Sequence, residues 1–425
     1  MICPGENMIG FETLYSWVRD LPVVDWHNHL DMKMLAEDKP LGSLYEVWVK
    51  PDPYKHRAMR ICGEPERVIT GDASEVEKWD AWTRTLPKLV GNPLFAWAKM
   101  ELEKFNVESG KLKVVDGEAK IENVSLSEWT PSKILKAFNV EYLSPCVGAG
   151  EIFFCHKERK GRKEVSAASA SLREIKITPS LRMNAGDEIS VEALEKFDSS
   201  GCRVVDISVD DVAKLTTHNS QLSTVAAFAA AHGWTMLLHM GALRETSARL
   251  RAAAGPAGGF AGMRSAVDPA AVAAFLNGLE STHNPVQNSL PRTILMSLNP
   301  EAHAPLAVLA GSFNEDGVPG KVQLGPAWWW CDHEEGIRDV LEKNAAYGVL
   351  STFIGMTTDS RSLLSFVRHD YFRRVLCKWV AEKIEKSAFP DDESLLRPML
   401  ENICNKNARR IFSRLVNPVN PVNPV

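Results

Sequence analysis

The stretch VVDWHNHLD, residues 23–31, gives the first indication of both the fold and the chemistry. Its apolar start predicts a buried β-strand, and His27 and His29 follow with one residue between them. Side chains two residues apart on a strand point to the same face. The strand would therefore present two imidazoles together, as a metal site requires. Chance spacing is the alternative, because the chain contains 11 histidines.

Seven further apolar runs share the character of this first strand. The predicted strands are residues 23–27, 140–146, 177–182, 202–209, 234–240, 292–299, 321–330 and 350–359. Helical patterns separate most of them, as at residues 268–280, where Asp268 can cap the helix and Pro269 can start it. Eight buried strands alternating with helices predict an α/β fold, the (β/α)8 TIM barrel. A doubly wound open sheet is the competing arrangement, but no glycine-rich turn follows the first strand.

The first two strands are separated by an unusually long segment. Residues 32–130 exceed an ordinary loop, show helical periodicity and are rich in tryptophan. We expect a mainly helical subdomain over the barrel mouth, inserted after residues 1–31, which supply the N-terminal segment and the first strand. Residues 131–415 then complete the barrel. The last ten residues, 416–425, repeat proline at every third position and predict a disordered tail.

Composition excludes several classes of protein. A net charge of −5, with 45% hydrophobic and 24% charged residues, is typical of a globular protein and lacks the basic excess of a nucleic-acid binder. No apolar run is long enough to span a membrane, so we expect neither export nor anchoring. The eight cysteines are scattered without CxxC pairs, which indicates reduced thiols in the cytoplasm. We also expect a homo-oligomer that binds a small molecule.

Closure of the barrel would place the first and the eighth predicted strands side by side. Catalytic residues of such barrels lie at the C-terminal ends of strands, and the eighth strand neighbours the first. Asp359 ends the eighth predicted strand, so we expect it beside His27 and His29. Two imidazoles and a carboxylate suit one divalent ion per subunit, with zinc preferred. His239, at the end of the fifth strand, is a fourth ligand, a substrate contact, or equally a histidine oriented by the backbone.

Several motifs together resemble one enzyme family. They are DWHNHL, PYKHRAMR, LLHMGALRETSARL, TILMSLNP, GKVQLGPAWWW and, as the longest and most specific, GMTTDSRSLLSFVRHDYFRRVLC. The chain in these stretches resembles the uronate (glucuronate) isomerases of the amidohydrolase superfamily. The resemblance runs from the first strand to NICNKNARRIF. It implies a distorted (β/α)8 barrel of the metal-dependent hydrolase type, with a helical insertion after strand one.

The resemblance also implies an activity and its residues. The family interconverts D-glucuronate with D-fructuronate, and D-galacturonate with D-tagaturonate, in hexuronate catabolism. Moving a proton from C2 to C1 requires a base, a group that protonates the neighbouring position, and stabilisation of the enediolate between them. The resemblance implies that His27, His29 and Asp359 are metal ligands, that Tyr54 is the catalytic tyrosine, and that Arg182 and Arg361 contact the substrate. With these carried over, we expect Asp359, Tyr54 and Arg361 to be catalytic, and His29, His239 and Trp330 to be further substrate contacts.

Other interpretations of these residues stay open. Arg182 could form a structural ion pair, and Tyr54 could be an ordinary packed or surface residue. Of the three tryptophans 328–330, we expect one ring, that of Trp330, to meet the sugar and two to pack. The charged stretch RHDYFRR, which contains His369 and Asp370, is equally a network behind the site or the start of a charged helix.

The chain departs from the family pattern near the expected substrate. Pro53 replaces the usual histidine before the tyrosine, His56 replaces a tryptophan, and SPCVGAG, residues 144–150, replaces an acidic turn. The preferred hexuronate is therefore left open. Two other functions compete. Residues 202–209 lack the bridging lysine of a two-metal hydrolase, which argues against that form. A one-metal hydrolase of a sugar-acid lactone stays open, because it could use the same ligands with metal-bound water. A non-catalytic sugar-acid binding protein is the second alternative.

Overall fold

The computed structural model describes residues 8–104, 114–121, 125–151, 175–217, 219–265, 267–280 and 290–412. The predicted tail at 416–425 lies outside the described residues. Within the described part of the chain, no helix combines the length and the apolar character needed to cross a bilayer.

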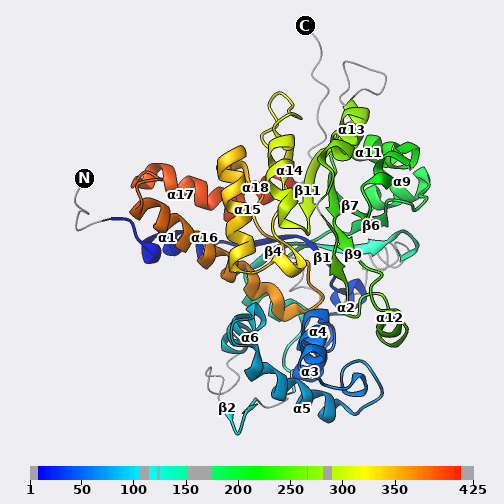
Figure 1. Ribbon diagram of the computed structural model, residues 1–425, viewed down its shortest axis with the longest axis vertical. Helices are drawn as coiled ribbons and strands as arrows, with labels where there is room; N and C mark the ends of the chain where they lie inside the picture. The colour runs from blue at the N-terminus through cyan, green and yellow to red at the C-terminus, as the bar shows by residue number, and fades with distance from the viewer. Residues whose placement is uncertain are drawn as a thin grey trace, which may run out of the picture.

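Parallel strands in chain order form the centre of the molecule (Figure 1). They are β1 (Val23–Asn28), β4 (Val140–Gly148), β6 (Ser180–Asn184), β7 (Val204–Val209), β8 (Thr235–Met240), β11 (Arg292–Ser297) and β12 (Val322–Leu324), with β5 (Lys176–Ile177) pairing beside β4. Every residue of β1, β7 and β8 is buried. Burial on both faces and sequential parallel pairing are the properties of a barrel wall, so the predicted α/β barrel class is confirmed.

The eighth predicted strand is wrong as a strand. Residues 350–352 form a short 3₁₀ helix, and residues 353–359 form no regular structure. Gly355 and Asp359 have φ of +77° and +49°, values that interrupt an extended ladder. The segment still closes the barrel: the Asp359 amide donates to the His27 carbonyl at 3.1 Å, and the Ile354 amide donates to the Gln323 side chain on β12 at 2.8 Å. The seventh strand is likewise shorter than predicted, because β12 ends at Leu324.

Helices surround the sheet as the periodicity predicts. They are α7 (Pro131–Ala137), α9 (Val191–Ser199), α10 (Ala213–Thr217), α11 (Asn219–Ala231), α12 (Ala248–Ala254), α13 (Pro269–Glu280), α14 (His303–Ala310), α15 (Glu334–Tyr347) and α16 (Val367–Glu385), with α1 (Phe11–Val18), α17 (Glu393–Glu401) and α18 (Asn407–Phe412) packed nearby. The predicted cap is present, because Asp268 accepts a hydrogen bond from the Ala270 amide at 2.9 Å.

A second group of helices follows β1 and gathers at one side of the sheet (Figure 1). It contains α2 (Met32–Glu37), α3 (Leu44–Trp48), α4 (Pro53–Ile61), α5 (Glu75–Thr85) and α6 (Pro93–Lys104), with the small hairpin β2 (Val114–Val115) and β3 (Glu118–Ala119). Buried Trp48, Trp79, Trp82 and Trp97 belong to its hydrophobic cluster. Burial of these large rings stabilises the group through the hydrophobic effect.

Helix α4 is fixed over the barrel from two directions. Asp52 caps its N-terminus by accepting hydrogen bonds from the amides of Tyr54 at 2.9 Å and Lys55 at 3.3 Å. From the barrel side, the loop around Gly259 packs on the helix start. A Cβ at Gly259 would lie 2.1 Å from the Pro53 carbonyl oxygen, so only glycine fits this close approach. These contacts place Tyr54 in the first helical turn, facing the barrel.

Candidate active site

A cavity of about 530 Å³ lies where the barrel strands end and helix α4 covers them. All of the residues predicted for the site line it: His27, His29, Tyr54, Arg182, His239, Trp330, Asp359 and Arg361. They come from β1 and the residue after it, from α4, β6 and β8, from the short 3₁₀ helix Trp329–Cys331 after β12, and from residues 359–361. The fold therefore brings together every candidate that the sequence named, including Tyr54 from the inserted helices.

Asp359 contacts both His27, on β1, and His29, which directly follows the strand. Its Oδ1 lies 3.0 Å from Nε2 of His27 and 3.0 Å from Nε2 of His29. Burial alone would raise the pKa of the Asp359 carboxyl, but the hydrogen bonds with His27 and His29 hold it well below its ordinary value. Burial lowers the pKa of His29 to about 4, against the opposing effect of Asp359. Asp359 is therefore ionised and His29 is neutral at physiological pH, the forms in which both bind metals.

Two buried atoms beside this group lack partners. Asp359 Oδ2 and His239 Nε2 form no hydrogen bond with any residue that the structure describes. Buried polar atoms are normally satisfied, so unpaired ones facing a polar cavity indicate a ligand. Side-chain donor atoms of His27, Asp206 and His239 lie within 4.8 Å of one another, as do those of His27, His29 and Cys146. The donor set and its free atoms are consistent with a buried divalent metal site.

Asp206 is a site residue that sequence reasoning missed. Its Oδ1 lies 2.7 Å from His239 Nδ1, and its Oδ2 lies 2.7 Å from Arg182 Nη1. Burial would raise the pKa of Asp206, but Arg182, His239 and His27 hold it well below its ordinary value. The available signal was a carboxylate inside the apolar run VVDISV, where an unpaired charge would be costly. His239 is thus oriented by a carboxylate, and the backbone is not its partner.

Arg182 forms an ion pair and also lines the cavity. It forms the ion pair with Asp206 and also donates to Ser208 Oγ at 2.8 Å. Its side chain is nevertheless 25% exposed and lines the cavity. The ion pair orients a guanidinium that still faces the space where a substrate would bind.

Tyr54 has a neutral hydroxyl at the cavity wall. Burial raises its pKa above the ordinary value; Arg368 opposes this rise, and Asp359 adds to it. The hydroxyl forms no hydrogen bond within the described part of the chain. The ring packs edge-on against Trp97 and Trp330, with centroids 6.2 Å and 5.4 Å away. Aromatic packing fixes the ring, and the hydroxyl has no hydrogen-bond partner among the described residues.

Further cations and aromatic rings complete the cavity. Arg361 is exposed and forms no ion pair with the residues that the structure describes. Arg244, which the sequence analysis did not name, donates to Asp210 at 3.0 Å and lies over the Trp329 ring at 4.8 Å. All three tryptophans at 328–330 line the cavity, and Trp328 also belongs to the buried core, so the expectation that one ring meets the sugar stays a prediction. The site offers positive charge and flat rings, which suits an anionic sugar.

The RHDYFRR stretch divides between the two interpretations. His369 Nε2 lies 3.3 Å from Asp25 Oδ1, and Asp25 also accepts hydrogen bonds from Thr357 and Thr358 on the closing segment. His369 therefore belongs to a network behind the site. Asp370 instead pairs with Arg374 at the surface side of α16, as a charged helix start would.

Comparisons with known proteins agree with this geometry. Residues 7–230 and 218–412 match the sequence family described as glucuronate isomerase. The uronate isomerase of Caldicellulosiruptor bescii is 32% identical over an alignment of 461 positions, which covers 94% of this chain and 96% of that relative.

Solved structures extend the likeness to three dimensions. The uronate isomerase of Thermotoga maritima has a TM-score of 0.79 at 25% identity, covering 97% of this chain and 100% of that one. The glucuronate isomerase of Caulobacter crescentus, at 19% identity, shares the fold with a TM-score of 0.73 and covers 95% of this chain and 93% of that one. The family match spans His27 and His29 as well as Asp359 at the closing segment. The chain belongs to the glucuronate isomerase family.

Proposed function

We propose that the chain isomerises a hexuronate aldose to its ketose, D-glucuronate to D-fructuronate or D-galacturonate to D-tagaturonate, by moving a proton between C2 and C1. One observation carries the proposal. The Asp359 carboxylate is hydrogen-bonded through Oδ1 to two histidines, while its buried Oδ2 is unpaired in a cavity that also contains the Tyr54 hydroxyl. A base and a proton donor thus share one cavity, as an isomerase requires.

Substrate binding would depend on the cations of the cavity. A guanidinium can engage both oxygens of a carboxylate, so Arg361, free of ion pairs among the described residues, is the candidate for the sugar carboxylate. Arg182 and Arg244 are each held by an aspartate and would contact the hydroxyl and carbonyl oxygens. The Trp330 ring would lie against the apolar face of the sugar.

The two proton-transfer groups start in suitable forms. Asp359 is ionised because its pKa is low, so it can accept the proton from C2. Tyr54 is protonated because its pKa is raised, so it can donate a proton to C1 once the hydroxyl proton of the enediolate has passed from O2 to O1. Return of the proton from Asp359 to Tyr54 restores both groups for the next turnover. The arginines would stabilise the negative oxygens of the enediolate meanwhile.

The proposed resident metal is one zinc ion per subunit. His27, His29 and Asp359 would hold it, with His239 as the further donor, since two imidazoles and a carboxylate form a usual zinc set. When bound, the ion supplies a Lewis acid that polarises substrate oxygens. We also propose a cytoplasmic location, because the described cysteines are free thiols. The expected homo-oligomer stays a prediction.

Turnover of a small hexuronate panel tests the proposal. Purified chain should form ketose from D-glucuronate or D-galacturonate, and it should leave the corresponding lactones intact. Lactone hydrolysis without ketose formation would instead indicate the one-metal hydrolase. Calorimetric binding of hexuronate with neither product would indicate a binding protein.

A further inference from the structure

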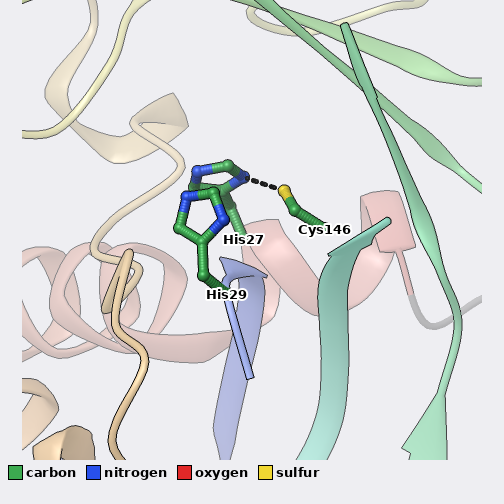
Figure 2. Close-up of side chains that lie close together, drawn as sticks. All are labelled: His27, His29 and Cys146. Atoms are coloured by element: carbon green, nitrogen blue, oxygen red, sulfur yellow. Dashed lines mark hydrogen bonds between the residues drawn. The ribbon is translucent and has the colours of Figure 1, made fainter. Parts of the chain in front are cut away.

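Cys146 contacts the metal-site histidine from the side away from Asp359. It lies at the end of β4, and Figure 2 shows its sulfur directed at the ring of His27. Sγ is 3.3 Å from His27 Nδ1, whereas Asp359 Oδ1 is 3.0 Å from Nε2. The two nitrogens lie on different edges of one imidazole. Cys146 and Asp359 therefore hold the His27 ring between them.

A carboxylate lies behind the sulfur and can take its proton. Cys146 Sγ is 3.5 Å from Asp206 Oδ2, within the distance for a thiol donor. Asp206 is buried and ionised, with Arg182 and His239 as its other partners. An ionised carboxylate only accepts hydrogen bonds, so the thiol proton points toward Asp206. The sulfur lone pairs are then available to His27.

The buried atoms without hydrogen-bond partners near His27 belong to residues of the proposed metal site. Asp359 Oδ2 and His239 Nε2 are buried without a partner among the described residues. A neutral histidine that binds a metal through Nε2 carries its proton on Nδ1, and that proton needs an acceptor. In metal sites this acceptor is usually a carboxylate, a carbonyl or water. Here the atom at hydrogen-bond distance from Nδ1 is a sulfur.

We propose that Cys146 is a positioning residue for His27: its sulfur accepts the Nδ1 proton and its own proton is donated to Asp206, which leaves the Nε2 lone pair on the side of Asp359. The inference rests on the proposed ligand set of His27, His29 and Asp359. It gives a specific role to the segment SPCVGAG, where the chain departs from the family pattern. Among the described hydrogen bonds, Cys146 is the only residue of this segment that bonds to the His27 ring. It also couples Asp206 to the metal through a thiol.

Metal affinity of cysteine variants tests this role. Zinc or cobalt would be titrated into metal-free full-length chain against a chelator of known affinity, for wild type, Cys146→Ala, Cys146→Ser and Cys202→Ala. Cys202 is the matched control, because it is a buried thiol before β7, at the opposite end of the barrel strands. We expect Cys146→Ala to weaken metal binding about 10- to 100-fold. Cys146→Ser keeps a donor and an acceptor, so it should restore most of the affinity.

Three results would overturn the inference alone. They are equal affinity of wild type and Cys146→Ala, an equal loss in Cys202→Ala, and a sulfur-to-metal charge-transfer absorption in the cobalt protein that disappears in Cys146→Ser. The last result would make the thiolate a ligand itself. A wild-type chain that binds neither ion would contradict the proposed metal set as well, so the two failures are distinguishable.

Discussion

Nε2 of His27 lies 3.0 Å from Oδ1 of Asp359, although 332 residues separate them in the chain. The contact exists because the closing segment runs beside β1, with the Asp359 amide bonded to the His27 carbonyl. It also creates a chemical conflict. The histidines that hold Asp359 lower its pKa, and a carboxylate of low pKa is a weak base at neutral pH. In the proposed mechanism, the arginines of the cavity compensate for this by stabilising the enediolate.

The proposed metal ligands are tested by removing the two imidazoles of His27 and His29. The purified chain should contain about one divalent ion per subunit, and the His27→Ala, His29→Ala double variant should lose it, because a single carboxylate holds such an ion weakly. Elemental analysis of both proteins measures this. His303→Ala, which changes a buried histidine bonded to Asp339, is the control and should keep its metal. Unchanged metal in the double variant would refute the assignment.

Tyr54→Phe removes only the hydroxyl and keeps the ring packed against Trp97 and Trp330. We expect kcat to fall by a factor on the order of 10², because one proton-transfer group is lost, with an unchanged thermal midpoint. Tyr371→Phe is the matched control, since Tyr371 also packs on Trp97 but does not line the cavity. If Tyr54→Phe turned over hexuronate at the wild-type rate, the hydroxyl would have no catalytic role.

Arg361→Met removes the cation that we assign to the sugar carboxylate. Loss of a charge-assisted hydrogen-bonded pair costs about 1.5–3 kcal/mol, which corresponds to roughly 10- to 100-fold in kcat/KM. Arg361→Lys should recover part of the loss, because it keeps the charge but not the planar fork. Arg397→Met, at an exposed ion pair on α17, should leave kinetics unchanged. Wild-type kcat/KM in Arg361→Met would contradict the assignment.

The pH dependence of stability should change with His56. Burial lowers its pKa from 6.5 to about 4 in the folded chain. Between these values the unfolded chain binds more protons, so the free energy of unfolding decreases as pH falls from 6.5 toward 4, by at most about 1.4 kcal/mol per pH unit from this group. Above pH 6.5 the contribution is fully present. His56→Gln should flatten the dependence in urea unfolding at pH 7, 5.5 and 4.5. An identical slope in both proteins would show that His56 does not contribute.

The fold was predictable where hydrophobic periodicity is strong. Apolar runs predicted β1, β7 and β8, which are buried throughout. Capping residues such as Asp268 predicted where helices begin. The closing segment was mistaken for a strand, because its composition is apolar and β-branched. Some of its backbone amides donate to side chains instead of to a neighbouring strand, as the Thr358 amide does to Asp25. Its positive φ values cannot be predicted from amino-acid composition.

The candidate site was predictable where residues end strands. His27, His29 and His239 follow from the ends of predicted strands, and Asp359 follows from barrel closure. Tyr54 and Arg182 needed the family resemblance, because nothing local places α4 over the cavity or assigns Arg182 to a substrate. Asp206 and Cys146 were missed, since their roles come from contacts across strands: Asp206 touches β6 and β8, and Cys146 touches β1. Spacing within one strand does not encode such contacts.

The central claim is that Asp359 is the base of an aldose–ketose isomerisation, and Asp359→Asn measured in metal-loaded protein tests it most directly. The substitution keeps the size and one oxygen but removes the base. With metal content verified, kcat for ketose formation from hexuronate should fall by about 10³-fold or more, within the range for loss of acid–base catalysis. Near-wild-type ketose formation by metal-loaded Asp359→Asn would contradict the account and leave Asp359 as a ligand only.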